Sequence, residues 1–191
     1  MPSEAITVTL RVIDSLESLG VPYFVGGSLA GAVHGVARAT LDCDIVADLH
    51  AEHVDEFIRS LGDDFYADAE AIRDAIGHRT SFNIVHLQTM FKVDVFVTKW
   101  RPFDREQFER RTLRTFTEEP TRKVYLASAE DTVLAKLEWF RLSGDRSERQ
   151  WLDVMGIIKA QREMLDLIYL QRWARELGMG DLLQRAFDEA Q

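Results

Sequence analysis

The chain has 191 residues, of which 46% are hydrophobic, and its formal net charge at pH 7 is −9. This length fits one domain with or without a small helical appendage, and the hydrophobic share supports a packed core, which excludes a disordered protein. The acidic balance argues against a generic nucleic-acid coat protein, because non-specific binding to nucleic acids is driven by cationic surfaces. We therefore expect no generic DNA binding.

The N-terminus and the single cysteine further narrow the class of protein to which this chain belongs. Residues Met1–Ala5 lack the basic and apolar segments of a secretion signal, and no apolar run reaches the length of a membrane span. We therefore expect a cytoplasmic protein with no membrane partner. Cys43 is the only cysteine, which excludes an intramolecular disulfide and a cysteine-based zinc site, so we expect a buried thiol.

The first predicted element is an amphipathic helix over residues 3–19, where apolar residues recur at helical spacing. A short strand is predicted over 21–25 and a helix over 28–36, with a tight turn at Gly26 and Gly27 between them. A strand, a glycine turn and a helix form an anion-binding arrangement, since glycines let a phosphate approach the backbone and the start of a helix offers free amides. The turn is therefore a candidate phosphate site.

The strand predicted over residues 41–47 carries two acids. Side chains alternate between the two faces of a strand, so Asp42 and Asp44 point the same way, as does Thr40 before them. Two neighbouring carboxylates repel each other unless a cation neutralises them, and Mg²⁺ is usually held by one or two carboxylates together with substrate phosphates. The opposite face of this strand is expected to meet the core through Leu41, Cys43, Ile45 and Ala47.

Two predicted helices, over residues 51–61 and 67–76, separate this strand from a third acid. The segments 81–88 and 90–98 predict two strands that are close enough to form a hairpin. Asp94 lies within the second segment, where an unpaired charge is strongly destabilising. A neighbouring strand could bring Asp94 to the first two acids and complete a site for two Mg²⁺ ions, or for Mn²⁺.

The rest of the chain is predicted to be mostly helical. Strand-like runs at 111–116 and 123–126 precede Ser128, which is predicted to cap a helix that ends near Ser143. The remaining predicted helices span residues 149–162, 166–177 and 181–190. Three aromatic residues at or near this region are assigned to the core, where large aromatics usually pack: Tyr125, Trp139 and Trp151.

Basic residues gather between Lys99 and Lys123, and again at a predicted helix junction that holds Arg141, Arg146 and Arg149. They are open to two interpretations. Either they line a track for a polynucleotide, or they lie on solvated faces and are balanced by nearby acids.

In their order and spacing, these motifs resemble the nucleotidyltransferase superfamily, which shares the polymerase-beta-like fold. The resemblance rests on Gly26-Gly27-Ser28, on the run from His34 to Ile45 with its two acids, on the later strand acid, and on Glu130-Asp131 followed by Lys136. It covers roughly residues 21–160. Within the superfamily, the chain is most similar to small bacterial minimal and AbiEii-like toxin–antitoxin nucleotidyltransferases, some of which are toxins.

The resemblance implies an α/β (α+β) fold, with a small mixed β-sheet nucleotidyltransferase core and flanking helices over residues 1–126. A C-terminal helical portion over 127–191 would pack on this core, as one continuous domain or as a second one. The implied reaction is transfer of a nucleoside monophosphate from an NTP to an acceptor hydroxyl with release of pyrophosphate, an EC 2.7.7-type reaction.

The resemblance also implies roles for individual residues. The metal ligands would be Asp42, Asp44 and Asp94, with Asp94 also accepting the proton of the attacking hydroxyl. The other nucleotide-binding residues would be Gly26, Gly27, Ser28, Thr40, Lys136 and Asp153. Lys136 would neutralise triphosphate charge, and Asp153 would orient Lys136 or contact the base or ribose. A plain salt bridge between helices is the alternative for this pair, and Arg38 would meet a phosphate or pair with an acid such as Asp48.

The acceptor stays open among the 3′ end of a tRNA, a hydroxyl of a partner protein, and a small molecule such as an aminoglycoside. The acidic net charge favours a cationic small molecule or a protein over a long RNA, whereas the subgroup resemblance favours a toxin–antitoxin setting. Two further alternatives are a catalytically silent module of the same fold that binds a nucleotide or a partner, and a purely structural subunit.

Overall fold

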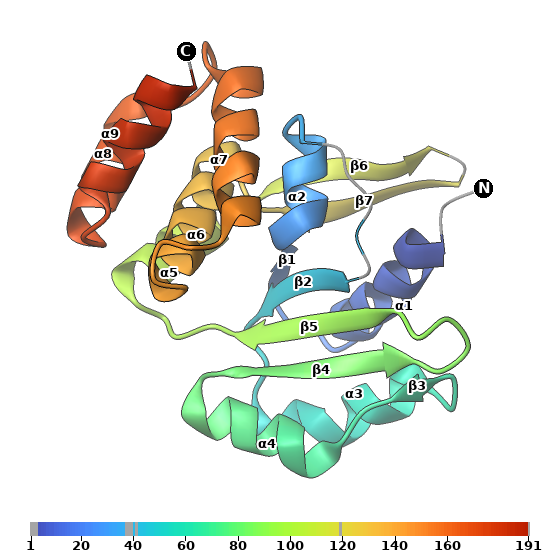
Figure 1. The fold of residues 1–191 in the computed structure, drawn as a ribbon. Coiled ribbons are helices and arrows are strands. Elements are labelled where there is room, and N and C mark those ends of the chain that lie inside the picture. The colour runs from blue at the N-terminus through green and yellow to red at the C-terminus, as the bar shows by residue number, and fades with distance from the viewer. Residues whose placement is uncertain (1–3, 37–39, 41, 119, 191) are drawn as a thin grey trace. The chain divides into compact units, whose positions relative to one another are not determined.

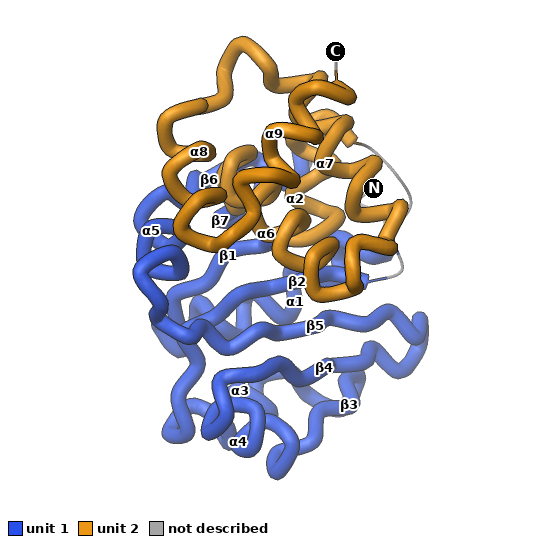
Figure 2. Tube along the Cα trace, turned by 60° about the vertical axis from the view of Figure 1, so that its left-hand side comes forward, with its two compact units in different colours: residues 1–26, 40–126 blue, residues 27–39, 127–191 orange. Residues whose placement is uncertain are grey.

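A computed structural model describes residues 4–36, 40, 42–118 and 120–190. The chain forms two compact units (Figure 2): unit 1 comprises residues 1–26 and 40–126, and unit 2 comprises 27–39 and 127–191. Residues 27–39 thus group with the C-terminal helices, while the predicted division of the chain into a core over 1–126 and a helical portion over 127–191 stays a prediction. Among the described helices, none combines the length and the apolar character that a membrane span requires.

The described part of unit 1 contains a seven-stranded mixed sheet in the order β3-β4-β5-β2-β1-β7-β6 (Figure 1). Its strands are β1 (Tyr23–Val25), β2 (Asp42–Ala47), β3 (Phe65–Tyr66), β4 (Ser81–His86), β5 (Lys92–Val97), β6 (Thr112–Glu118) and β7 (Thr121–Leu126). β2 pairs with β5 in parallel and with β1 in antiparallel orientation, and β4 and β5 form the predicted hairpin. The mixed sheet with its helices confirms the predicted α/β (α+β) class.

Helices of unit 1 bury the apolar side of this sheet. They are α1 (Glu4–Ser18), α3 (Val54–Leu61), which follows the short 3-10 helix η1 (Ala51–His53), α4 (Ala69–His78) and α5 (Pro102–Arg110). α1 packs against α3 and β2, and α4 packs against α3 and β4. Ile13 of α1, Phe57 of α3 and Ile72 of α4 are almost fully buried, and burial of each such side chain contributes roughly 1.5–3 kcal/mol.

Two elements of unit 1 were not predicted from the sequence. β3 has only two residues, which is too short for a recognisable pattern. α5 begins with Pro102 at its first turn, where the missing N–H of proline is tolerated. Asp104 then accepts a hydrogen bond from the backbone N–H of Arg101 at 2.9 Å, which satisfies a donor at the start of the helix.

The alternation predicted for β2 is confirmed. Cys43, Ile45 and Ala47 are buried, while Asp42 and Asp44 on the other face are partly exposed. Cys43 is the buried free thiol that its sequence context predicted. Leu41, which was also expected to face the core, lies outside the described residues.

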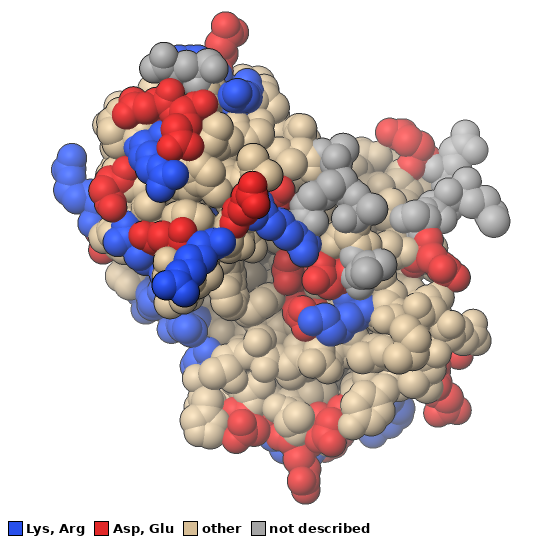
Figure 3. Space-filling model, in the orientation of Figure 1, with Lys and Arg blue, Asp and Glu red and all other residues tan. Residues whose placement is uncertain are grey.

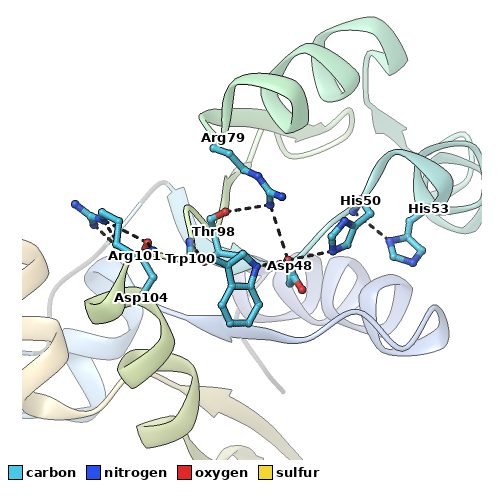
Figure 4. A network of polar contacts seen from close by, with 8 residues as sticks. All are labelled: Asp48, His50, His53, Arg79, Thr98, Trp100, Arg101 and Asp104. Carbon is cyan, nitrogen blue, oxygen red and sulfur yellow. Dashed lines mark hydrogen bonds and ion pairs between the residues drawn. The ribbon is translucent and has the colours of Figure 1, made fainter.

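A polar network around Asp48 joins the ends of β2 and β5 (Figure 4). Asp48 follows β2 and accepts a hydrogen bond from the indole Nε1 of Trp100 at 2.8 Å, with Nε2 of His50 at 3.2 Å from the same oxygen. Arg79 donates to the carbonyl oxygen of Thr98, just after β5, at 3.2 Å, and one of its guanidinium nitrogens lies 4.0 Å from Asp48. The network therefore ties together the ends of the two strands that carry the predicted site acids.

The described part of unit 2 is helical. Its helices are α2 (Gly27–Val33), α6 (Ala129–Leu142), α7 (Glu148–Gln161), α8 (Leu167–Glu176) and α9 (Gly180–Glu189). Ser128 caps α6 as predicted, since its hydroxyl accepts a hydrogen bond from the N–H of Asp131 at 3.0 Å. The predicted helix over 28–36 ends early, at Val33, because Gly35 adopts a φ of +112°.

The C-terminal aromatics divide between core and surface. Trp151 is buried as predicted and donates a hydrogen bond from Nε1 to Glu189 at 2.8 Å. The assignment of Trp139 to the core is wrong, because this residue is 51% exposed on α6. In unit 1, Tyr125 is half-buried, with its ring 5.9 Å from that of Tyr23.

Candidate active site

The three predicted acids lie on one face of two neighbouring strands. In the parallel register of β2 and β5, Asp44 lies opposite Asp94 and Asp42 lies opposite Lys92. Both strands alternate partly exposed and buried residues, so these four side chains share the partly exposed face. On the next strand, β4, Asn83 lies opposite Asp94. We call Asp42, Asp44 and Asp94 the acid row.

A lysine provides positive charge on this face. Nζ of Lys92 lies 2.7 Å from Oδ2 of Asp94. The pKa of Lys92 is raised above its ordinary value, first by the hydrogen bond to Asp94 and then by the negative charges of all three carboxylates. Burial raises the pKa of the Cys43 thiol, and the charges of the same three carboxylates raise it further. The acid row therefore acts as one electrostatic cluster.

Backbone and hydroxyl contacts fix the β2 end of the acid row. The hydroxyl of Thr40 donates to Oδ1 of Asp42 at 2.7 Å, as expected from its position two residues earlier. The backbone N–H of Gly26 donates to the carbonyl oxygen of Asp44 at 2.9 Å. The first glycine of the predicted phosphate turn thus lies beside the strand that carries the acids.

In unit 2, Lys136 and Asp153 form a buried ion pair. Nζ of Lys136 on α6 lies 2.7 Å from Oδ2 of Asp153 on α7, and the two side chains are 4% and 6% exposed. Nζ also lies 3.4 Å from Oε1 of Gln150. Gly31 of α2 lies beside the lysine, since a Cβ at this position would be in ordinary van der Waals contact with Cε of Lys136, at 3.6 Å. The ion pair is compatible both with a plain salt bridge between helices and with an orienting role of Asp153, the two interpretations that the sequence left open.

Arg149 is a neighbour of Ser28 that sequence reasoning missed. Its Nη2 lies 3.4 Å from the Ser28 hydroxyl oxygen, within unit 2. From the sequence, Arg149 was only one member of a basic group. Its position one helical turn before Asp153 was the available signal, because residues four apart share a helix face. The predicted phosphate ligand Ser28 therefore has an exposed guanidinium beside it.

Several solved structures resemble this fold, although no family model and no curated protein matches the sequence. The solution structure of the antibiotic-resistance factor ANT(2'')-Ia aligns with a TM-score of 0.56 at 12% identity, over 92% of this chain and 96% of that one. The chain has a nucleotidyltransferase fold.

Two further structures share this nucleotidyltransferase fold. An antigenic nucleotidyltransferase-like protein from Paracoccidioides brasiliensis aligns with a TM-score of 0.52 at 18% identity, over 93% of each chain. The lincosamide antibiotic adenylyltransferase LnuA, solved with lincomycin bound, aligns with a TM-score of 0.51 at 18% identity, over 79% of this chain and 94% of that one. The predicted resemblance to the superfamily is therefore confirmed for the fold, and the AbiEii-like subgroup stays a prediction.

The chemistry of the acid row fits the divalent metal predicted for a nucleotidyltransferase fold. Over the described residues, no three His, Cys, Asp or Glu side chains are arranged to hold one ion. Asp94 instead contacts Lys92, and Asp42 contacts Thr40. The donors are nonetheless hard carboxylate oxygens, which Mg²⁺ prefers, and an ammonium group already lies within hydrogen-bond distance of one of them. The donor chemistry of this face therefore suits a hard cation.

The basic residues between Lys99 and Lys123 are at least partly engaged with acids. Arg101 pairs with Asp104, and Arg122 lies 2.5 Å from both Asp14 and Glu17. On the face drawn in Figure 3, acidic and basic side chains are interspersed. These contacts favour the solvated-face interpretation over a polynucleotide track. Arg38, whose role the sequence left undecided, lies outside the described residues.

Proposed function

We propose that the protein is a metal-dependent nucleotidyltransferase, which transfers a nucleoside monophosphate from an NTP to an acceptor hydroxyl and releases pyrophosphate. The observation that carries the proposal is the register of β2 and β5, which brings Asp94 opposite Asp44 and completes the acid row. The likeness to solved nucleotidyltransferases supports it at the level of the fold.

Asp42, Asp44 and Asp94 would hold two Mg²⁺ ions, which neutralise triphosphate charge and lower the pKa of the attacking hydroxyl. Asp94 accepts the proton of that hydroxyl at a carboxylate oxygen. The acceptor oxygen forms a bond to the α-phosphorus, and the bond from this phosphorus to the bridging oxygen breaks, so the electron pair leaves with pyrophosphate. Thr40 holds the carboxylate of Asp42 through its 2.7 Å hydrogen bond. Positioning and electrostatics then supply most of the rate.

We assign nucleotide phosphates to Gly26, Gly27 and Ser28. The Ser28 hydroxyl and the Arg149 guanidinium lie 3.4 Å apart, so both can donate to one phosphate oxygen. Lys136 and Asp153 are further proposed nucleotide contacts. Because these two side chains are buried against each other, the pair has to open before Lys136 meets a phosphate.

The acceptor that we propose is a small cationic molecule with a free hydroxyl. ANT(2'')-Ia is described as an antibiotic-resistance factor, and LnuA is described as a lincosamide antibiotic adenylyltransferase. A net charge of −9 favours a cationic acceptor over a polyanion such as tRNA. Transfer to a tRNA end or to a partner protein in a toxin–antitoxin system is the competing outcome of the test.

The test is to incubate the protein with Mg²⁺ and each α-³²P-labelled NTP, both in total cell extract and with a panel of aminoglycosides and lincosamides. The Asp42→Ala/Asp44→Ala variant is the negative control, and Asp63→Ala/Glu70→Ala removes two exposed acids of unit 1 as its match. Label on a small molecule that requires Asp42 and Asp44 supports the proposal. Label on an RNA or a protein would identify that macromolecule, rather than a small molecule, as the acceptor. No label despite Mg–NTP binding would indicate a catalytically silent module.

A further inference from the structure

Lys92 lies inside the acid row although no acceptor or nucleotide role has been assigned to it. It lies opposite Asp42 across β2 and β5, and two residues before Asp94 on its own strand. Residues two apart on a strand share a face. The lysine therefore lies beside acids of both strands, and its Nζ forms a 2.7 Å contact with Oδ2 of Asp94.

We propose that Lys92 is a built-in counter-cation of the acid row, which holds Asp94 in the metal-free protein and has to leave Asp94 when a metal binds. The inference rests on the proposed function, because it requires that the acid row binds a metal. It assigns Lys92 a positioning role that acts through Asp94.

Charge balance is the first argument. Three carboxylates on one face repel one another, and this repulsion favours protonation or a bound cation. The ammonium group of a lysine is charged at neutral pH, and Nζ of Lys92 lies 2.7 Å from one of these carboxylates. One ammonium leaves a net charge of about −2 on this face, which is enough to attract a divalent ion. Lys92 therefore relieves the repulsion without cancelling the attraction for metal.

Geometry is the second argument. Asp94 cannot use the same carboxylate oxygen for Lys92 at 2.7 Å and for a metal ion at about 2.0–2.1 Å without placing two cations side by side. In the described part of the chain, the acids are not gathered around one point in the way that a metal site requires. Releasing Lys92 from Asp94 is the rearrangement that frees this carboxylate. The lysine side chain is 42% exposed, so it can swing toward solvent without opening the core.

The competing explanation is an ordinary surface ion pair. Exposed pairs contribute little to stability, and their removal changes it equally with and without a ligand. A counter-cation behaves differently, because it stabilises the metal-free state and opposes the metal-bound state. An ordinary ion pair therefore predicts no change in metal affinity when Lys92 is replaced, whereas a counter-cation predicts tighter metal binding.

The test measures Mn²⁺ binding without nucleotide, by electron paramagnetic resonance at low salt. Lys92→Met removes the charge and keeps the length of the side chain, Lys92→Arg keeps the charge, and Lys123→Met removes an exposed lysine of β7 as the matched control. We expect Lys92→Met to bind Mn²⁺ at least about fivefold more tightly than wild type, and the other two to stay within about twofold. The gain should shrink in 1 M KCl, because salt screens the charge.

Thermal unfolding of the same proteins gives a second readout. Metal-free Lys92→Met should melt below wild type, and saturating Mn²⁺ should close or reverse the difference. Equal or weaker Mn²⁺ binding by folded Lys92→Met, with normal binding by wild type, overturns the role of Lys92 alone. Equal Mn²⁺ binding by wild type and Asp42→Ala/Asp44→Ala instead overturns the metal site, and the proposed function with it.

A measurement on the wild-type protein keeps the proposal testable if Lys92→Met does not fold. In protein labelled with [¹⁵N]lysine, the Nζ signal of Lys92, assigned with Lys92→Arg, should be visible and slow to exchange without metal, because Asp94 holds the ammonium group. Titration with Mg²⁺ should shift and broaden this signal in step with binding. A Lys92 signal that stays unchanged while Mg²⁺ binds overturns the proposal.

Discussion

Asp44 and Asp94 lie opposite each other on parallel neighbouring strands, although fifty residues separate them in sequence. Parallel pairing needs a long connection, and here it contains α3, β3, α4 and β4. The same register places Lys92 beside Asp42. A single strand pairing therefore brings together the three acids and the lysine that balances part of their charge. Substitutions within this row should therefore change chemistry more than they change folding.

Replacement of Asp94 by asparagine should abolish most transfer while the protein stays folded. The amide keeps the shape of the side chain, but it can neither accept the proton of the hydroxyl nor balance a cation. We expect the rate of labelled NMP transfer to fall by at least about 100-fold. Ser81→Ala, on the exposed face of β4, should keep the rate within about threefold. Substantial transfer by Asp94→Asn would show that the third acid is dispensable.

Loss of either partner of the Lys136–Asp153 pair should strongly destabilise the protein. Each single change, Lys136→Met or Asp153→Leu, removes the oppositely charged partner of a buried charge and should lower the free energy of unfolding by about 3–5 kcal/mol. The double variant should recover most of that loss, since an apolar pair of similar volume replaces the ion pair. Urea unfolding of the wild type, the two single variants and the double variant measures these changes in the free energy of unfolding.

The same double variant separates a structural role from a nucleotide-binding role. If Lys136 contacts the triphosphate, the restored double variant stays inactive in the labelled-NTP assay. Recovery of activity together with stability would assign the pair to packing of α6 against α7 alone.

The Asp48 network should stabilise unit 1 through the Trp100 indole. Trp100→Phe removes the N–H that donates to Asp48 and leaves a mostly buried carboxylate with one partner fewer. We expect a loss of about 1–3 kcal/mol in unfolding free energy by urea titration. Trp139→Phe, at a half-exposed position, should change stability by less than about 0.5 kcal/mol. Equal effects of the two substitutions would contradict the network's role.

Tyr23 should make stability fall at alkaline pH. Its pKa is raised above the ordinary value, mainly by burial and then by its hydrogen bond to Glu17. In the unfolded chain tyrosine loses its proton near pH 10, while folded Tyr23 keeps it, so unfolding releases a proton above that pH. The stabilisation is full below pH 10 and decreases as pH rises, by up to about 1.4 kcal/mol per pH unit. The unfolding free energy of Tyr23→Phe should decline less steeply between pH 9.5 and 11, and parallel curves would refute the assignment.

Local patterns in the sequence predicted most elements and the acid row, because alternation and helical periodicity are properties of neighbouring residues. Gly35 shows one limit: its positive φ ends α2 at Val33, whereas apolar spacing alone continued the helix. α5 was missed because its segment is mainly charged, although Pro102 marked its start. The acceptor had no local signal at all.

Contacts between distant residues account for the remaining differences at the candidate site. Arg149 and Ser28 are 121 residues apart, so no spacing rule links them. Lys92 and Asp94 are the opposite case, since their separation by two residues on a strand already placed them on one face. The apolar run around Asp94 indicated an unpaired charge, whereas Lys92 on the same strand is its partner.

The strand order has a consequence for local unfolding. β2 and β5 are interior strands, while the sheet ends at β3 and β6. Opening of a sheet starts at its edges, so amide hydrogens of β2 and β5 should be among the slowest to exchange with solvent in unit 1. The acids would then keep their spacing while the edge strands of the sheet open and close. Sequence changes in the edge strands and loops would leave that spacing unchanged.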